Sequence, residues 1–259
     1  MLQTYIAFCI GIFGIIMGSF LNVVASRHNV KTLSGRSHCP KCGTTLNWYE
    51  LVPVVSYIAL MGRCRSCQSK ISPRYIVVEL SVGVASFVHA SLAPDILTLV
   101  FGLCALYIST VLFLYDMQSR FLPLNIMLLL IMFGIISVVS NLYVTTVHTV
   151  AFFVLLFYAT LPALFLFLLS LCSRGKWMGM GDSILLIGLT LYAPNPSVTL
   201  TTLILSSWIG AVYGIGKIIH TKLQRKKQYD QHIIAFGPSI IISFFLSWWI
   251  YIVYGSLLI

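Results

Sequence analysis

The chain has 259 residues, of which 59% are hydrophobic and only 8% are charged, and its mean hydropathy is +0.96. Soluble domains carry about 25% charged residues, so this composition excludes an ordinary soluble enzyme and predicts an integral membrane protein. In a soluble protein, a formal charge of +10 would indicate a nucleic-acid partner. Here the cations gather between long apolar runs, so we expect no nucleic-acid partner and interpret them as signals of membrane topology.

The first apolar run, residues 5–25, is long enough to span a bilayer. No Lys or Arg precedes it and no small-residue cleavage site follows it, so we interpret it as an anchor helix and not as a removable signal peptide. A polar segment, residues 26–75, comes next. Seven further apolar runs follow, at about 76–93, 97–115, 123–142, 149–171, 183–194, 198–217 and 236–258. The predicted fold is an all-α polytopic membrane protein with about eight transmembrane helices and a small insert between the first two.

The positions of Lys and Arg determine the predicted topology. With the N-terminus outside, all sixteen of these residues fall on the cytoplasmic side of the membrane or at its interface, as the positive-inside rule requires. This orientation makes the 26–75 insert cytosolic. The run at 183–194 is short for a bilayer core of about 30 Å, so we expect this helix to be tilted or sheltered by neighbouring helices.

The insert contains two C-x-x-C motifs, in the sequences HCPKCG and GRCRSCQ. They supply four thiols, from Cys39, Cys42, Cys64 and Cys67. Four thiolates on two tight turns are typical of a tetrahedral zinc site, and its role is structural because no coordination position stays open. Nearby glycines let backbone N–H groups approach sulfur, and nearby Lys and Arg residues favour thiolate over thiol. The alternatives are two disulfides or four unliganded thiols, although disulfides seldom persist in the cytosol.

Two of the six acidic residues lie where an apolar run meets the cytoplasmic interface. Asp116, in LYDMQSRFLP, follows the run at 97–115, and Asp182, in GMGD, precedes the run at 183–194. An ionisable group at this depth is expensive to keep, so it is a functional candidate by default. Two carboxyl groups that share one water molecule cannot both ionise cheaply. One then acts as base and the other as acid, which is the chemistry of aspartyl proteases.

Gly179 and Gly181 immediately precede the second of these aspartates. We predict an extended, side-chain-free segment there, against which a peptide could lie closely. Both carboxylates also have purely structural interpretations. Asp182 could be the N-cap of the following helix, and Asp116 could pair with Arg120 four residues later.

Glu79 lies inside the second predicted helix, within a turn of its cytoplasmic end. It could pair with Arg74, or it could help to orient the site. The six histidines form no H-E-x-x-H group, which disfavours a zinc protease, and no G-x-S-x-G motif indicates a serine hydrolase.

Taken together, these motifs resemble the bacterial type IV prepilin peptidases, also called leader peptidase/N-methyltransferases, which are G-x-G-D membrane aspartyl proteases. The similarity covers GSFLNVV at 18–24, the segments around both C-x-x-C motifs, the two aspartate motifs, and FGP at 236–238. Two departures bear on substrate preference. Ile184 stands where the family commonly has Lys, and Leu124 stands where it often has an acid.

The resemblance implies an enzyme of the bacterial inner membrane that removes the basic leader from type IV prepilins or pseudopilins. It implies cleavage on the cytoplasmic side, just after a glycine, by Asp116 and Asp182. It also implies that the four cysteines bind the metal and that S-adenosylmethionine serves a second step, N-methylation of the new terminus. We divide the chain into a first transmembrane helix (1–25), a zinc-binding insert (26–75) and a seven-helix peptidase domain (76–259).

Two other functions are compatible with parts of the sequence. An ion-coupled transporter would use the aspartates as cation ligands, but such groups usually lie near the bilayer midplane and not at helix ends. A membrane scaffold would use the zinc insert for docking. Because a basic enzyme face repels a basic leader, we also expect anionic membrane lipid to be a partner that attracts both.

Overall fold

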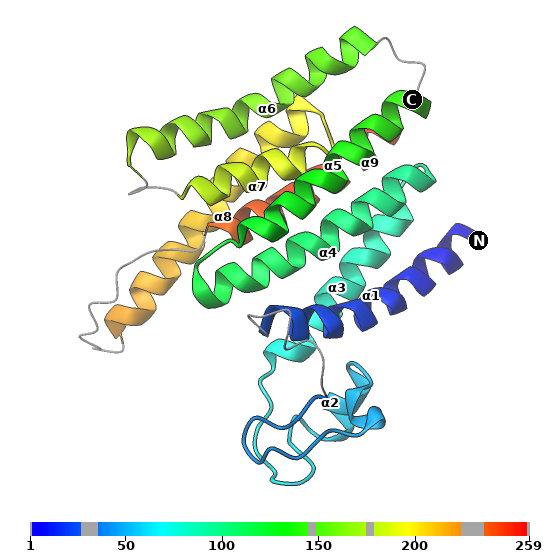
Figure 1. Cartoon of the computed structure of the whole chain (residues 1–259), viewed down its shortest axis with the longest axis vertical. Coiled ribbons are helices and arrows are strands. Elements are labelled where there is room, and N and C mark those ends of the chain that lie inside the picture. Colours follow the sequence, from blue (N-terminus) through cyan, green and yellow to red (C-terminus); the bar gives the residue numbers. More distant parts are fainter. Residues whose placement is uncertain (1, 27–35, 145–148, 175–178, 224–235, 258–259) are drawn as a thin grey trace. The chain divides into compact units, whose positions relative to one another are not determined.

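The computed structural model describes residues 2–26, 36–144, 149–174, 179–223 and 236–257 (Figure 1). Within these ranges the secondary structure is helical apart from isolated bridges. Seven of the described helices are long and apolar enough to cross a membrane, and one further apolar helix is shorter. The prediction of an all-α polytopic membrane protein is confirmed, with seven candidate spans among the described residues and the shorter helix where the eighth was expected.

The chain forms two compact units, Met1–Ala93 and Pro94–Ile259. The first contains α1 (Leu2–Ser26), η2 (Trp48–Leu51), α2 (Val55–Ala59) and α3 (Arg74–Leu92). In this unit α1 packs closely against α3. A Cβ atom on Gly18 would lie 2.9 Å from the Cα of Glu79, so only glycine permits this approach of the two backbones.

The second unit contains α4 (Ile96–Ser119), α5 (Leu124–Val144), α6 (Thr149–Cys172), α7 (Met180–Thr190), α8 (Pro196–Leu223) and α9 (Gly237–Leu257). The short helix α7 contacts α5, α6 and α9 (Figure 1). Most of its side chains are buried, and just beyond it the hydroxyl of Tyr192 donates to the backbone oxygen of Leu130 at 2.7 Å. The expectation that the shortest apolar helix is sheltered by its neighbours is confirmed.

Two helix ends that carry the candidate aspartates differ from the prediction. α7 begins at Met180, before the apolar run at 183–194, and α4 continues to Ser119, past the run at 97–115. Hydropathy marks the apolar part of a helix, whereas the backbone hydrogen bonds continue through polar residues at its ends. Both candidate aspartates therefore lie inside terminal helical turns and not in the flanking loops.

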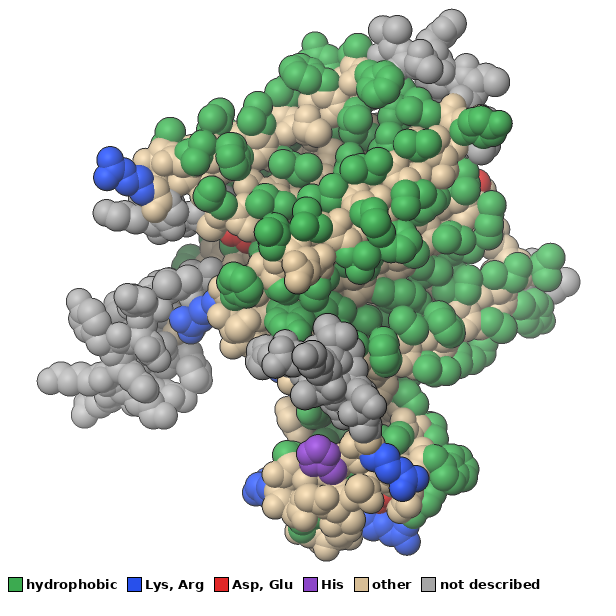
Figure 2. All heavy atoms as spheres, in the orientation of Figure 1, with side chains coloured by type: hydrophobic (Ala, Val, Ile, Leu, Met, Phe, Trp, Pro, Cys, Tyr) green, Lys and Arg blue, Asp and Glu red, His purple; other side chains and the backbone are tan. Residues whose placement is uncertain are grey.

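The described helices expose many large hydrophobic side chains, as expected of a membrane protein. Figure 2 shows hydrophobic side chains over the helices on the visible face, and large exposed ones include Phe8, Phe157 and Trp208. Lys and Arg side chains gather on the insert, where the described ones are Arg36, Lys41, Arg63, Arg65, Lys70 and Arg74. Residues 27–35 of the insert, Lys176 and the basic residues 225–227 lie outside the described ranges.

Candidate active site and metal centre

Asp116 lies in the last turns of α4, and its side chain is only 5% exposed. Its Oδ2 atom is buried and has no hydrogen-bond partner among the described residues. Arg120 ends the helix in a left-handed conformation, with φ of 54°, and its backbone N–H donates to the backbone oxygen of Asp116 at 2.9 Å. The two residues thus meet through their backbones, and the structural pairing of their side chains is not present.

Asp182 lies in the first turn of α7 and is 8% exposed. The N-cap of this helix is Gly179, and the backbone N–H of Asp182 donates to its oxygen at 3.2 Å, so the interpretation of Asp182 as N-cap is wrong. Gly179 is extended, as predicted, with φ −74° and ψ 145°. Gly181 is helical instead, because α7 starts at Met180, and a Cβ on it would lie 3.2 Å from Leu122 Cδ1.

The fold brings the two carboxyl groups together. They lie close enough for the charge of Asp116 to act on Asp182. Gly237, the first residue of α9, is a third component, since its backbone N–H interacts with the Asp116 carboxyl group. Two buried carboxyl groups that interact in this way cannot both ionise cheaply, an arrangement that suits general acid–base chemistry on one water molecule. The site is thus built from the end of α4 and the beginnings of α7 and α9.

The four cysteines of the insert form a cluster that could hold a metal ion. All four sulfur atoms lie within 4.8 Å of one another, and Cys39 Sγ lies 3.8 Å from Cys67 Sγ. A tetrahedral zinc ion with Zn–S bonds of about 2.3 Å places its sulfurs about 3.8 Å apart, so the arrangement fits that ion. All seven cysteines of the chain are free. The alternative of two disulfides is therefore wrong.

The two C-x-x-C turns have the same backbone geometry. The oxygen of Cys39 accepts from the N–H of Gly43 at 2.9 Å, and the oxygen of Cys64 accepts from the N–H of Gln68 at 2.9 Å. The donor residue is left-handed in both turns, with φ of 71° at Gly43 and 55° at Gln68. The first turn therefore has glycine, the residue that this left-handed conformation favours. The second turn has Gln68 in the same conformation, although residues with a side chain rarely adopt it.

Hydrogen bonds at two of the four cysteines favour the thiolate that a metal requires. Hydrogen bonds from the backbone of Cys42 and then of Lys41 lower the pKa of the Cys39 thiol to about 6. The side chain and then the backbone of Ser69 lower the pKa of Cys67. Lys41 thus contributes through its backbone N–H.

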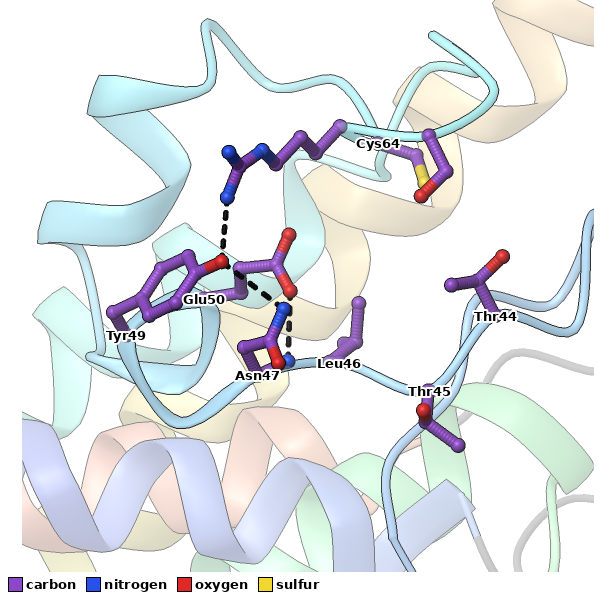
Figure 3. A pocket seen from close by; sticks show the side chains of 9 residues that line it. Thr44, Thr45, Leu46, Asn47, Tyr49, Glu50 and Cys64 are labelled. Carbon is purple, nitrogen blue, oxygen red and sulfur yellow. Dashed lines mark hydrogen bonds between the residues drawn. The ribbon is translucent and has the colours of Figure 1, made fainter.

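Next to the cluster the insert contains a polar pocket of about 430 Å³ (Figure 3). Glu50 accepts from the backbone N–H of Asn47 at 2.7 Å, and the Asn47 amide donates to the Tyr49 hydroxyl at 3.0 Å. Arg65 also donates to this hydroxyl, and its guanidinium carbon lies 5.6 Å from the centre of the Tyr49 ring. These groups satisfy one another, and no motif in the sequence indicates the Arg65–Tyr49 contact.

Glu79 of α3 reaches the insert. Its Oε2 atom accepts from the backbone N–H of Val54 at 2.8 Å, and the side chain is 7% exposed. Val54 has φ of 63°, a left-handed value that β-branched residues rarely adopt. Glu79 therefore binds a strained backbone segment and not Arg74. Glu79 belongs to the first unit, and a role in orienting the aspartates stays a prediction.

Comparisons with known proteins cover nearly the whole chain. The family model described as Bacterial Peptidase A24 N-terminal domain matches residues 12–92, and that of the Type IV leader peptidase family matches residues 101–215. A prepilin leader peptidase/N-methyltransferase of Vibrio cholerae is 32% identical over 250 residues, which cover 90% of this chain and 92% of the relative. One of Pseudomonas aeruginosa is 29% identical over 279 residues, covering 96% and 90%. No solved structure matches.

Proposed function

Because this chain belongs to the type IV leader peptidase family, we propose that it is a membrane aspartyl endopeptidase whose catalytic pair is Asp116 and Asp182. Its substrates are type IV prepilins or pseudopilins, from which it removes the basic leader on the cytoplasmic side. The observation that carries the proposal is the convergence of two buried carboxyl groups, from α4 and α7, that interact electrostatically. Incubation of the purified protein with a prepilin, followed by measurement of the product masses, tests it.

The chemistry follows from one proton shared between two carboxyl groups. The ionised carboxylate removes a proton from a water molecule, which attacks the carbonyl carbon of the scissile bond. The protonated partner donates a hydrogen bond to the carbonyl oxygen as negative charge develops there. The proton then passes to the leaving amine, and the pair returns to its starting state. No metal takes part in these steps.

Gly179 and Gly181 support the pair in this proposal. A Cβ on Gly179 would lie 3.7 Å from Oδ2 of Asp182, so the missing side chain leaves the carboxylate open on this side. The backbone of Gly179 is extended and carries no side chain beside the site, where a substrate in an extended conformation can lie. Gly181 allows α7 to approach Leu122.

The ion-coupled transporter is not favoured. The full-length relatives carry the name prepilin leader peptidase/N-methyltransferase, and the two family models that match the chain describe peptidase domains. The aspartates also lie at helix ends and not at interrupted helices.

We assign zinc to the four cysteines as a structural ion. A closed four-thiolate site leaves no open position for substrate, so the ion stabilises the fold of the insert and supplies no catalytic group. In this proposal residues 26–75 are the zinc-binding domain, between a first transmembrane helix at 1–25 and a peptidase domain at 76–259.

The proposal extends to N-methylation of the new terminus with S-adenosylmethionine, because the relatives carry that activity in their name. The insert pocket does not fit this cofactor well, since its carboxylate and guanidinium already bond to neighbouring groups.

Glu79 is expected to anchor the insert to α3. Replacing Glu79 with Ala should leave the Val54 N–H without its acceptor and destabilise the insert by about 1–3 kcal/mol. Limited proteolysis should then cut the insert faster than in the unmodified protein. The matched control is Glu79→Gln, which keeps an acceptor oxygen and should retain most of the protection. Equal protease resistance in all three proteins would show that this hydrogen bond does not hold the insert.

We place the chain in the bacterial inner membrane with its N-terminus outside and its insert in the cytoplasm, where anionic lipid attracts its basic face. A cysteine introduced at 193–197 should react with a membrane-impermeant maleimide on intact cells, and one at position 226 should react only after permeabilisation, in each case beyond the labelling of a chain that carries the four insert cysteines alone. The membrane cysteines Cys9, Cys104 and Cys172 are replaced by Ser beforehand. Labelling in the opposite pattern would reverse the topology.

A further inference from the structure

The beginning of α9 meets Asp116 through one residue. Within residues 237–240, the N–H groups of Ser239 and Ile240 donate to the backbone oxygen of Phe236, at 3.0 and 3.2 Å. Pro238 has no N–H group. Gly237 is therefore the one residue of this turn whose N–H is directed to another element, and the group that it meets is the Asp116 carboxyl.

Gly237 also leaves no room for a side chain. A Cβ atom on it would lie 2.8 Å from Oδ2 of Asp116, closer than real Cβ contacts come. The next atom outside Asp116 is Cδ2 of Leu185, at 3.6 Å, which is an ordinary contact. The oxygen that a Cβ would displace is the same buried Oδ2 that has no hydrogen-bond partner among the described residues.

From these contacts we propose that Gly237 is a positioning residue for the peptidase. Its N–H and its missing side chain together hold the Asp116 carboxyl group in the orientation that faces Asp182. The unpaired Oδ2 stays available for the water molecule. This inference rests on the proposed function, because it takes Asp116 to be one of the catalytic carboxylates.

The test is Gly237→Ala. Ala favours a helix more than Gly does, so α9 should form and the protein should stay monodisperse in detergent. The added Cβ should turn the Asp116 carboxyl group away, and a displacement of about 1 Å at a reacting group costs about 10²-fold in rate. We expect this loss in kcat for prepilin cleavage, with KM little changed.

The matched control is Gly255→Ala in the same helix, where an added Cβ meets nothing within 4 Å. It should cleave at the rate of the unmodified protein. If Gly237→Ala cleaves equally well while Asp116→Asn is inactive, the positioning role is overturned and the proposed function stands. If Asp116→Asn itself retains cleavage, the proposed function fails and this inference fails with it.

A second measurement covers the case in which Gly237→Ala does not fold. The double variant Asp116→Ala/Gly237→Ala lacks the carboxyl group that the new Cβ would strike, so it should recover a monodisperse protein with the thermal stability of Asp116→Ala. Recovery supports the contact. Failure of the double variant to recover would place the obstruction elsewhere and overturn the inference.

Discussion

Replacing Asp116 with Asn, or Asp182 with Asn, should lower the rate of leader removal by about 10²- to 10⁴-fold, the range that general acid–base catalysis supplies. Asn is nearly isosteric with Asp and keeps the side chain polar, but it cannot take up or deliver the proton. Each variant should therefore insert into the membrane and fold, with only proton transfer lost. The measurement is the single-turnover rate of prepilin cleavage by purified protein in detergent or liposomes.

Asp95→Asn is the matched control for this pair. Asp95 is the N-cap of α4, the helix that carries Asp116, and it accepts from the N–H of Thr98 at 2.8 Å. Asn caps a helix about as well as Asp, so this variant should retain both stability and activity. Substantial cleavage by Asp116→Asn or Asp182→Asn would remove that residue from the mechanism.

Loss of the four-thiolate site should unfold the insert, which is the second large effect that we expect. Structural zinc in small domains contributes about 10–16 kcal/mol of apparent binding energy that is also folding energy. Replacing Cys39 or Cys67 with Ser should therefore lower the zinc content from about one ion per chain to nearly none and make the insert sensitive to protease. Metal analysis of the purified protein and limited proteolysis measure the two effects.

Cys172→Ser is the control for the metal prediction, because Cys172 is an exposed thiol that lies outside the cluster. It should keep both the metal and the protease-resistant insert. Cleavage should fall only through damage to the insert, since the attacking water is activated by carboxylates. Metal-free protein with an unchanged insert would contradict the assignment of zinc as a structural ion.

Much of the fold follows from simple patterns in the sequence. Apolar runs predict the membrane helices, and the spacing of the cysteine pairs predicts the cluster, because both signals are local. The short α7 also follows, since eleven residues that cannot span a bilayer alone require shelter. The candidate aspartates follow from their depth, because a carboxyl group at the end of an apolar run needs a reason to be there.

The remaining features depend on contacts between distant segments. Nothing near Glu79 in the sequence indicates that it accepts from the N–H of Val54, or that Val54 is left-handed. The contact of Gly237 with Asp116 is equally non-local. The FGP motif at 236–238 singles out Gly237 in the sequence but does not indicate which residue it contacts. The left-handed conformation of Gln68 could not be predicted either, because the residue is not a glycine. The geometry of the thiolate turn imposes this conformation.

The most direct test of the proposed peptidase activity is to measure the mass of a membrane-embedded prepilin before and after incubation with the purified, zinc-loaded protein. We predict two products, the basic leader ending in its glycine and the mature chain beginning at the next residue, and we predict neither product with Asp116→Asn/Asp182→Asn. An intact prepilin after incubation with folded, zinc-loaded protein would contradict the account. So would the same cleavage by the double variant.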